Sequence, residues 1–91
     1  MSHFTNTKEW VEVNPLRSWR KGRKLSSQEV ALLLTVSLVT ISYWEHGTVR
    51  PGAVNMAAIA ELLEFSHSAL EAQWSDWRAA APGRAELLGR E

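Results

Sequence analysis

The residues whose side chains could carry out recognition chemistry lie together between positions 37 and 47. Ser42 and Tyr43 have hydroxyl groups that donate and accept hydrogen bonds, and Leu38 and Val39 offer apolar surface beside them. At helical spacing, these four side chains share the outer side of one segment. Such a surface can bind a partner through hydrogen bonds and apolar contacts without changing a covalent bond.

This segment has the sequence of a short helix with two defined ends. Ser37 can accept a hydrogen bond from the free N–H groups of the first turn, and Gly47 can adopt the left-handed conformation that ends a helix. Val36, Ile41 and Trp44 are spaced to face the interior. The sequence therefore predicts a helix that packs on the domain with one side and is free on the other.

Catalysis and metal binding are not indicated by any group of residues. His3, His46 and His67 have no second ligand at metal-binding spacing, the carboxylates are dispersed, and no glycine-rich phosphate loop follows a strand. The chain has no cysteine, which excludes a thiol nucleophile, a thiolate metal site and a disulfide. We therefore expect no enzymatic activity, no metal and no cofactor.

The length of 91 residues suits one domain with a core of modest size. No apolar run reaches the roughly 20 residues that cross a bilayer, and residues 1–6 lack the basic and then apolar pattern of a secretory signal. We expect a cytoplasmic protein that does not contact a membrane.

The net charge of zero hides an uneven distribution along the chain. Residues 16–50 contain six basic and two acidic residues, for a net charge of +4, whereas residues 51–91 contain three basic and six acidic residues, for a net charge of −3. Such a division fits a basic face turned to phosphate groups, with the acidic part turned away. Charge differences of this size also occur by chance in unrelated proteins.

Start signals define the other helices. Asn14 followed by Pro15 begins one helix. Ser26, with Glu29 three residues later, forms a capping box for the next, and Ser66 can cap the last. Only a three-residue turn separates the second helix from the third, a length typical of two helices that cross steeply. The predicted helices cover about residues 15–22, 27–35, 37–46, 54–63 and 67–80.

The ends of the chain are expected to differ from the middle. We predict an N-terminal arm over residues 1–13, a folded domain over 14–80 and a flexible tail over 81–91. Trp10 lies in the arm, in a stretch too short and mixed to indicate strand or helix. Its side chain can pack back on the domain or reach a partner, and packing is the favoured interpretation.

A stripe of apolar residues runs along the last predicted helix. Leu70, Trp74 and Trp77 recur at i, i+4 and i+7. Leu70 is expected to close the core. The two tryptophans either cover Trp10 or another tryptophan of the same chain, or meet the same stripe of a second subunit. These three residues are therefore candidates for a dimer interface.

Residues 25–37, followed by 40–47 and Pro51, resemble the helix-turn-helix family of the lambdoid phage repressors and Cro proteins, often called the XRE family. The resemblance extends over about residues 16–70. It implies an all-α, five-helix lambda repressor-like DNA-binding domain, here with an N-terminal arm and an extended fifth helix. Its most specific elements are Ala31, Val36, Ser37, Ile41, Trp44 and Glu45.

In this family the helix after the turn, here 37–46, lies in the major groove of duplex DNA. Family members often carry Gln, Arg, Asn or Lys at the positions that face base edges, and such contacts discriminate by about 1–3 kcal/mol each. This chain has mainly apolar side chains there, which would favour contacts with thymine methyl groups. The matching base-facing residues are Leu38, Val39, Ser42 and Tyr43.

The resemblance also assigns residues around this helix. Ser27, at the start of the preceding helix, matches a position that meets a phosphate. Arg20 and Glu45 match a structural pair that links the first helix to the end of the third. Further candidates for phosphate contacts are Arg17, Arg23, Lys24, Thr48 and Arg50.

The implied function is that of a sequence-specific transcriptional regulator, a repressor of bacterial or phage type associated with the nucleoid. Because one such helix contacts few base pairs, we expect a homodimer on a two-fold symmetric operator, with half-sites about 34–36 Å apart. An alternative stays open, in which the same fold binds a protein, such as a polymerase subunit or a toxin, through the exposed apolar residues of its third helix. That patch would consist of Leu32, Leu38, Val39 and Tyr43.

Overall fold

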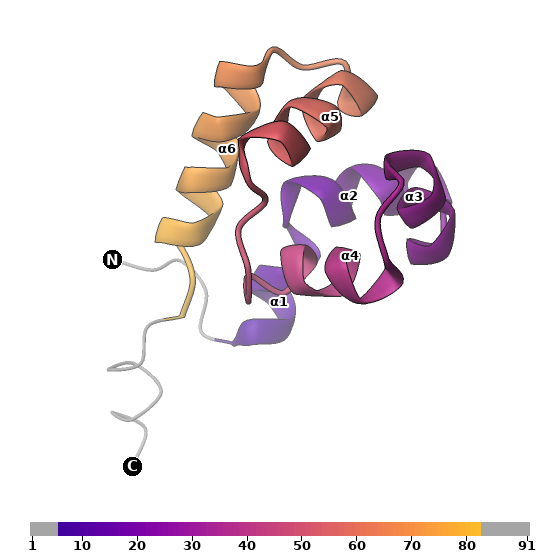
Figure 1. Ribbon diagram of the computed structural model, residues 1–91. Coiled ribbons are helices and arrows are strands. Elements are labelled where there is room, and N and C mark those ends of the chain that lie inside the picture. The colour runs from indigo at the N-terminus through magenta and orange to yellow at the C-terminus, as the bar shows by residue number, and fades with distance from the viewer. Residues whose placement is uncertain (1–5, 83–91) are drawn as a thin grey trace.

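Six helices and their connections make up residues 6–82, the part of the chain that the computed structural model describes (Figure 1). No strand occurs within these residues, which confirms the predicted all-α class. None of their helices is long and apolar enough to span a membrane. The predicted tail lies largely outside the described residues. The helices are α1 (Thr7–Glu12), α2 (Pro15–Gly22), α3 (Ser27–Leu34), α4 (Leu38–Glu45), α5 (Ala53–Leu63) and α6 (His67–Ala79).

Helix α1 stands where the sequence predicted an N-terminal arm. Asn6 caps it by accepting a 2.8 Å hydrogen bond from the backbone N–H of Glu9. Trp10 and Val11 are buried in the core, which confirms that Trp10 packs back on the domain. The prediction of an arm is therefore corrected to a sixth helix. Six residues are too few to show a helical period, so their sequence alone could not indicate this helix.

The predicted caps of four other helices are confirmed. Asn14 caps α2 by accepting hydrogen bonds from two backbone N–H groups of its first turn, both at 2.9 Å. Ser26 and Glu29 form the reciprocal capping box of α3, with distances of 3.1 Å and 2.9 Å. Ser37 and Ser66 each accept a backbone hydrogen bond at the start of α4 and α6.

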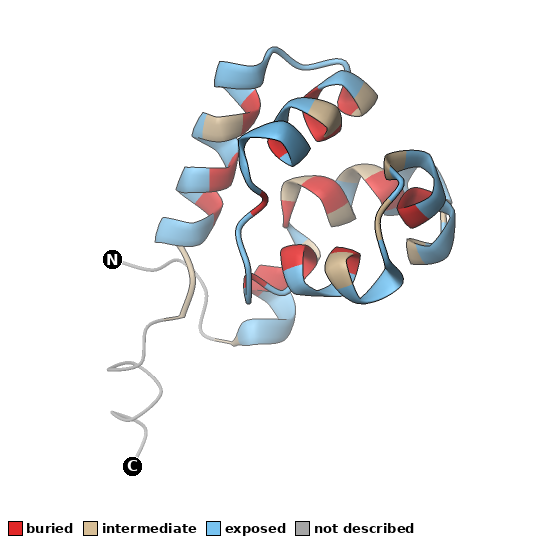
Figure 2. Cartoon of the chain, viewed as in Figure 1, coloured by how far each residue is buried: buried red, intermediate tan, exposed pale blue. Residues whose placement is uncertain are grey.

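Every helix contributes its inner side to one hydrophobic core (Figure 2). In the helix after Pro51, the helical spacing of Met56, Ile59, Ala60 and Leu63 predicts one inward side, and all four residues are buried. The inner side of α4 is likewise buried, and its outer side is exposed. The core residues are Trp10, Val11, Leu16, Val30, Ala31, Ile41, Trp44, Met56, Ile59, Ala60, Leu63, Leu70, Trp74 and Trp77.

The apolar stripe of α6 belongs to this core. Leu70 and Trp74 are fully buried, and Trp77 is 5% exposed. The ring of Trp77 stacks on Trp10, with centroids 4.1 Å apart. Of the two possibilities left open by the sequence, covering a tryptophan of the same chain is therefore correct. The prediction of a dimer interface at these three residues is corrected, since they have no surface left to offer a second subunit.

Candidate nucleic-acid interface

A turn of three residues joins α3 to α4. Helix α3 ends at Leu34 and is capped by Thr35, whose backbone is left-handed with φ 57°. The N–H of Val36 then donates to the carbonyl of Ala31 at 3.0 Å, and Ser37 caps α4. These contacts fix where one helix stops and the next starts. Two short helices connected in this way form a helix-turn-helix unit.

The outer side of α4 is exposed to solvent. Leu38, Val39 and Tyr43 are 51%, 56% and 47% exposed, and Ser42 lies among them on the exposed side. Ile41 lies on the opposite side and is fully buried. The structure therefore brings the four predicted base-facing residues to one surface, which is apolar except for two hydroxyl groups.

The carboxyl end of α4 is closed by a tight hydrogen-bonded motif. Gly47 has φ 75°, the left-handed conformation that its sequence position predicted. Its N–H donates to Trp44 O at 3.3 Å, and the N–H of Thr48 donates to Tyr43 O at 2.9 Å. This pair of bonds is the Schellman pattern, which satisfies the last carbonyl groups of a helix. The chain then leaves the interface through the exposed residues 48–50.

A buried ion pair attaches α4 to α2. Arg20 Nε lies 2.8 Å from Glu45 Oε2, and Arg20 Nη2 lies 2.9 Å from Glu45 Oε1. The hydrogen bonds that Arg20 donates to the Glu45 carboxylate raise the pKa of the Arg20 guanidinium, against the opposing effect of burial. The geometry matches that expected of a structural pair, because it orients two helices relative to each other.

Arg17 extends this ion pair and is unsuited to a phosphate contact. Its Nη1 lies 3.1 Å from Glu45, and its Nη2 lies 3.0 Å from Glu12. Lys21 binds the other oxygen of Glu12 at 2.7 Å. The assignment of Arg17 to phosphate is therefore corrected, because ion pairs with Glu12 and Glu45 already hold its guanidinium within the domain. Glu12 belongs to the expected arm, so only the helical path of α1 brings it to Arg17.

Asn14 is hydrogen-bonded to α4, a contact that the sequence did not indicate. Its side chain is fully buried, and its amide Nδ2 donates to Trp44 O at 3.2 Å. The same side chain caps α2 with its oxygen. The cap can be predicted from the sequence, whereas the second bond leaves no sequence signal, since its partner is 30 residues away.

The remaining phosphate candidates lie around the helix-turn-helix unit. Arg23, Lys24, Thr48 and Arg50 are exposed, in the turn before α3 and the turn after α4. Within residues 6–82, the cationic groups of these side chains form no ion pair, although Arg23 lies over the Trp19 ring at 5.3 Å. Ser27, the first residue of α3, is half-buried. Three uncompensated cations therefore flank the unit.

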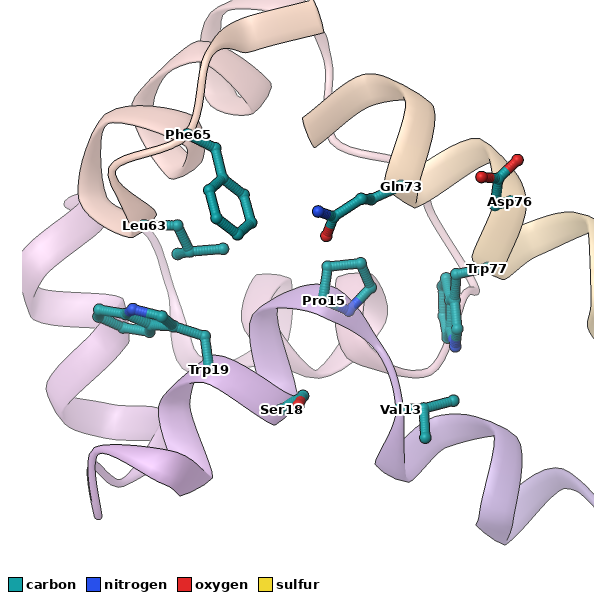
Figure 3. Close-up of a pocket in the computed structure, with 9 residues that line it drawn as sticks. All are labelled: Val13, Pro15, Ser18, Trp19, Leu63, Phe65, Gln73, Asp76 and Trp77. Atoms are coloured by element: carbon teal, nitrogen blue, oxygen red, sulfur yellow. The ribbon is translucent and has the colours of Figure 1, made fainter. Parts of the chain in front are cut away.

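A hollow beside α6 is separate from the exposed side of α4. It has a volume of about 440 Å³ and lies between α2, α6 and the turn that joins α5 to α6 (Figure 3). Trp19, Phe65 and Gln73 are among its lining residues, and Gln73 points into it. No residue of α4 lines it. Residues 6–82 also contain no cluster of side chains that could hold a metal ion.

A family model described as helix-turn-helix matches residues 16–70, which is more than half of the chain. The chain belongs to this family, the XRE family of helix-turn-helix proteins. Family membership indicates a DNA-binding regulator, and the family is not typically enzymatic. No curated protein and no solved structure matches the chain. The matched segment contains α2 to α5 and the first residues of α6, and it omits α1.

Proposed function

We propose that this protein is a transcriptional repressor that binds duplex DNA with sequence specificity by placing α4 in the major groove. The observation that carries the proposal is the division of α4 into two sides. Its inner side is anchored by Ile41 and by the Arg20–Glu45 ion pair, and its outer side carries the exposed Val39 and Tyr43. A rigidly held helix with a free side is the element that such domains insert into DNA.

Two kinds of contact are assigned to this surface. Leu38, Val39, Ser42 and Tyr43 would meet base edges, with the apolar groups favouring thymine methyls and the hydroxyls available for hydrogen bonds. Ser27, Arg23, Lys24, Thr48 and Arg50 would meet phosphates and fix the register of the protein on DNA.

The test is binding to duplex DNA over a series of salt concentrations. Three cations at the interface predict that log K falls against log[salt] with a slope of about −2.7 per protomer. A slope near zero would mean that no counterions are released, and it would exclude the proposal. Selection of a binding site from random duplexes would then give the operator, which we expect to be rich in T-containing steps.

A homodimer on a two-fold symmetric operator is part of the proposal. One helix of eight residues contacts too few base pairs for tight binding, so two copies with recognition helices about 34–36 Å apart would supply the affinity. The contact between copies has to avoid the tryptophans of α6, which are buried. Sedimentation of the protein with one-site and two-site duplexes measures the stoichiometry directly.

A second function is favoured by the apolar character of the same surface. Three large apolar side chains of α4 are about half exposed, and such patches commonly bind proteins. Replacing Val39 and Tyr43 by Ala separates the two functions. Loss of DNA binding supports the repressor, whereas unchanged DNA affinity with loss of a bound protein, such as a polymerase subunit or a toxin, supports the interaction module. We propose a cytoplasmic, nucleoid-associated location in the first case.

A further inference from the structure

Three side chains from outside the family-matched residues converge on the turn that follows α4. Trp10 comes from α1, and Trp77 and Arg78 come from α6. We call these three residues the terminal clamp. Each of them contacts, or lies within contact distance of, a single backbone position, Gly47.

The two tryptophans form a rigid unit. Their rings stack with an interplanar angle of 3° and a centroid distance of 4.1 Å. Trp10 Nε1 donates to Trp77 O at 2.6 Å, and Trp77 Nε1 donates to Trp10 O at 2.8 Å. Trp74 packs edge-on against Trp77, with centroids 5.9 Å apart. Because both indole N–H groups of the stacked pair are satisfied and buried, neither ring can rotate without losing a hydrogen bond.

This unit lies directly against Gly47. A methyl group built on Gly47 would lie 2.5 Å from Trp10 Cη2 and 3.2 Å from Trp77 Cη2, so the backbone approaches as closely as a glycine allows. The same methyl group would lie 2.9 Å from Arg78 Nη1, which donates to Gly47 O at 2.6 Å. Gly47 is therefore fixed by stacked rings and by a charge-assisted hydrogen bond.

Gly47 joins the proposed base-facing and phosphate-facing residues. Tyr43 O accepts the N–H groups of Thr48 and Val49 at 2.9 Å and 3.3 Å, and Arg50 follows in the same turn. We propose that the terminal clamp positions the turn 47–50 and the end of α4 for DNA binding, so that affinity depends on two segments outside the family domain. This inference rests on the proposed function. The three residues are positioning residues and do not themselves touch DNA.

The first experiment needs no DNA. Arg78→Ala removes an exposed side chain on a helix and should leave the fold intact, and Trp10→Ala removes half of the stacked unit. In both variants we expect amide hydrogen exchange at Thr48 and Val49 to accelerate about tenfold or more, because their local opening becomes easier. Exchange at Val36, in the turn before α4, should not change. Lys8→Ala removes an exposed cation from α1 and is the matched control.

The second experiment measures DNA affinity. We expect Arg78→Ala to weaken binding about tenfold, with an unchanged salt slope, because no phosphate contact is lost. A direct phosphate contact by Arg78 would instead reduce the magnitude of the slope by about 0.9. Arg78→Lys keeps a donor near Gly47 O and should restore part of the affinity. Lys8→Ala should bind as the unmodified protein does.

The outcomes separate this inference from the proposed function. If the unmodified protein binds DNA and both Arg78→Ala and Trp10→Ala bind equally well, the clamp does not position the interface. Unchanged exchange at Thr48 and Val49 in both variants also overturns it. If the unmodified protein shows no salt-dependent binding, the proposed function fails, whereas accelerated exchange would still establish that the clamp holds the turn.

Discussion

Arg20 and Glu45 face each other through a two-point ion pair that is almost fully withdrawn from solvent. The side chains are 8% and 1% exposed, and the two shortest N–O distances are 2.8 Å and 2.9 Å. Because the pair joins α2 to the last residue of α4, it sets the direction in which the exposed side of α4 points. Arg17 adds a third hydrogen bond to the same carboxylate.

Glu45→Ala should destabilise the fold strongly. The variant leaves the Arg20 guanidinium buried without its carboxylate, and breaking a buried pair in this way costs about 3–5 kcal/mol. Urea denaturation followed by tryptophan fluorescence measures the change. Glu61→Ala, on the exposed side of α5, is the control and should stay within about 0.5 kcal/mol of the unmodified protein. Equal stability of the two variants would contradict the structural role of the pair.

The stability of the protein should decrease as the pH falls below about 4.5, in part through Glu12. Hydrogen bonds from Lys21 and then from Arg17 lower the pKa of Glu12 from its ordinary value of 4.5. A carboxylate whose folded pKa is lowered contributes stability above its unfolded pKa, and this contribution is lost as the pH falls through the folded pKa. Glu12→Gln should therefore flatten the dependence of unfolding free energy on pH in this acidic range. An unchanged dependence would mean that the network with Lys21 and Arg17 does not form in solution.

Gly47→Ala and Gly22→Ala should change stability in opposite directions. At Gly47, a methyl group meets Trp10 at 2.5 Å and the backbone is left-handed, so we expect a loss of about 1–3 kcal/mol or more. At Gly22, in α2, nothing lies within 4 Å of the new methyl group, and a gain of up to about 1 kcal/mol is expected from helix propensity. Thermal or urea unfolding measures the change in stability of both variants. An unchanged stability of Gly47→Ala would show that the tryptophans can move aside.

Two substitutions in α4 should have different effects. Val39→Ala should mainly weaken DNA binding, and Ile41→Ala should mainly lower stability. Ile41 is fully buried, so its truncation should cost about 2–5 kcal/mol. Val39 is 56% exposed, and its truncation should hardly change stability while it weakens binding to the selected operator. Parallel measurements of unfolding and of DNA affinity test both statements. A large loss of stability in Val39→Ala would mean that this side of α4 is not free.

Local chemistry made much of the fold predictable. The caps at Asn14, Ser26, Ser37 and Ser66 act within three residues of their partners, so their effect can be inferred from sequence. The split of α4 into inner and outer sides follows from helical spacing alone. These two kinds of signal suffice to locate the helix-turn-helix unit and its exposed face.

Contacts between distant residues account for what the sequence did not indicate. The sequence left open whether Trp77 packs against a tryptophan of its own chain or against a second subunit. Only the path of α1 decides this, because it brings Trp10 into contact with Trp77. Arg17 appeared to be a free cation because its partner Glu12 lies in a segment with no visible helical period. The phosphate set consequently loses one member, while the assignments at Arg23, Lys24 and Arg50 remain predictions.

The contact between Trp10 and Trp77 also constrains how the protein is made. It joins residues 67 positions apart, so the chain must be synthesised almost to the end of α6 and released from the ribosomal exit tunnel before α1 can dock. The packing of α1, the first helix of residues 6–82, is thus completed only after α6 is available, and until then the indole of Trp10 lacks the ring on which it stacks.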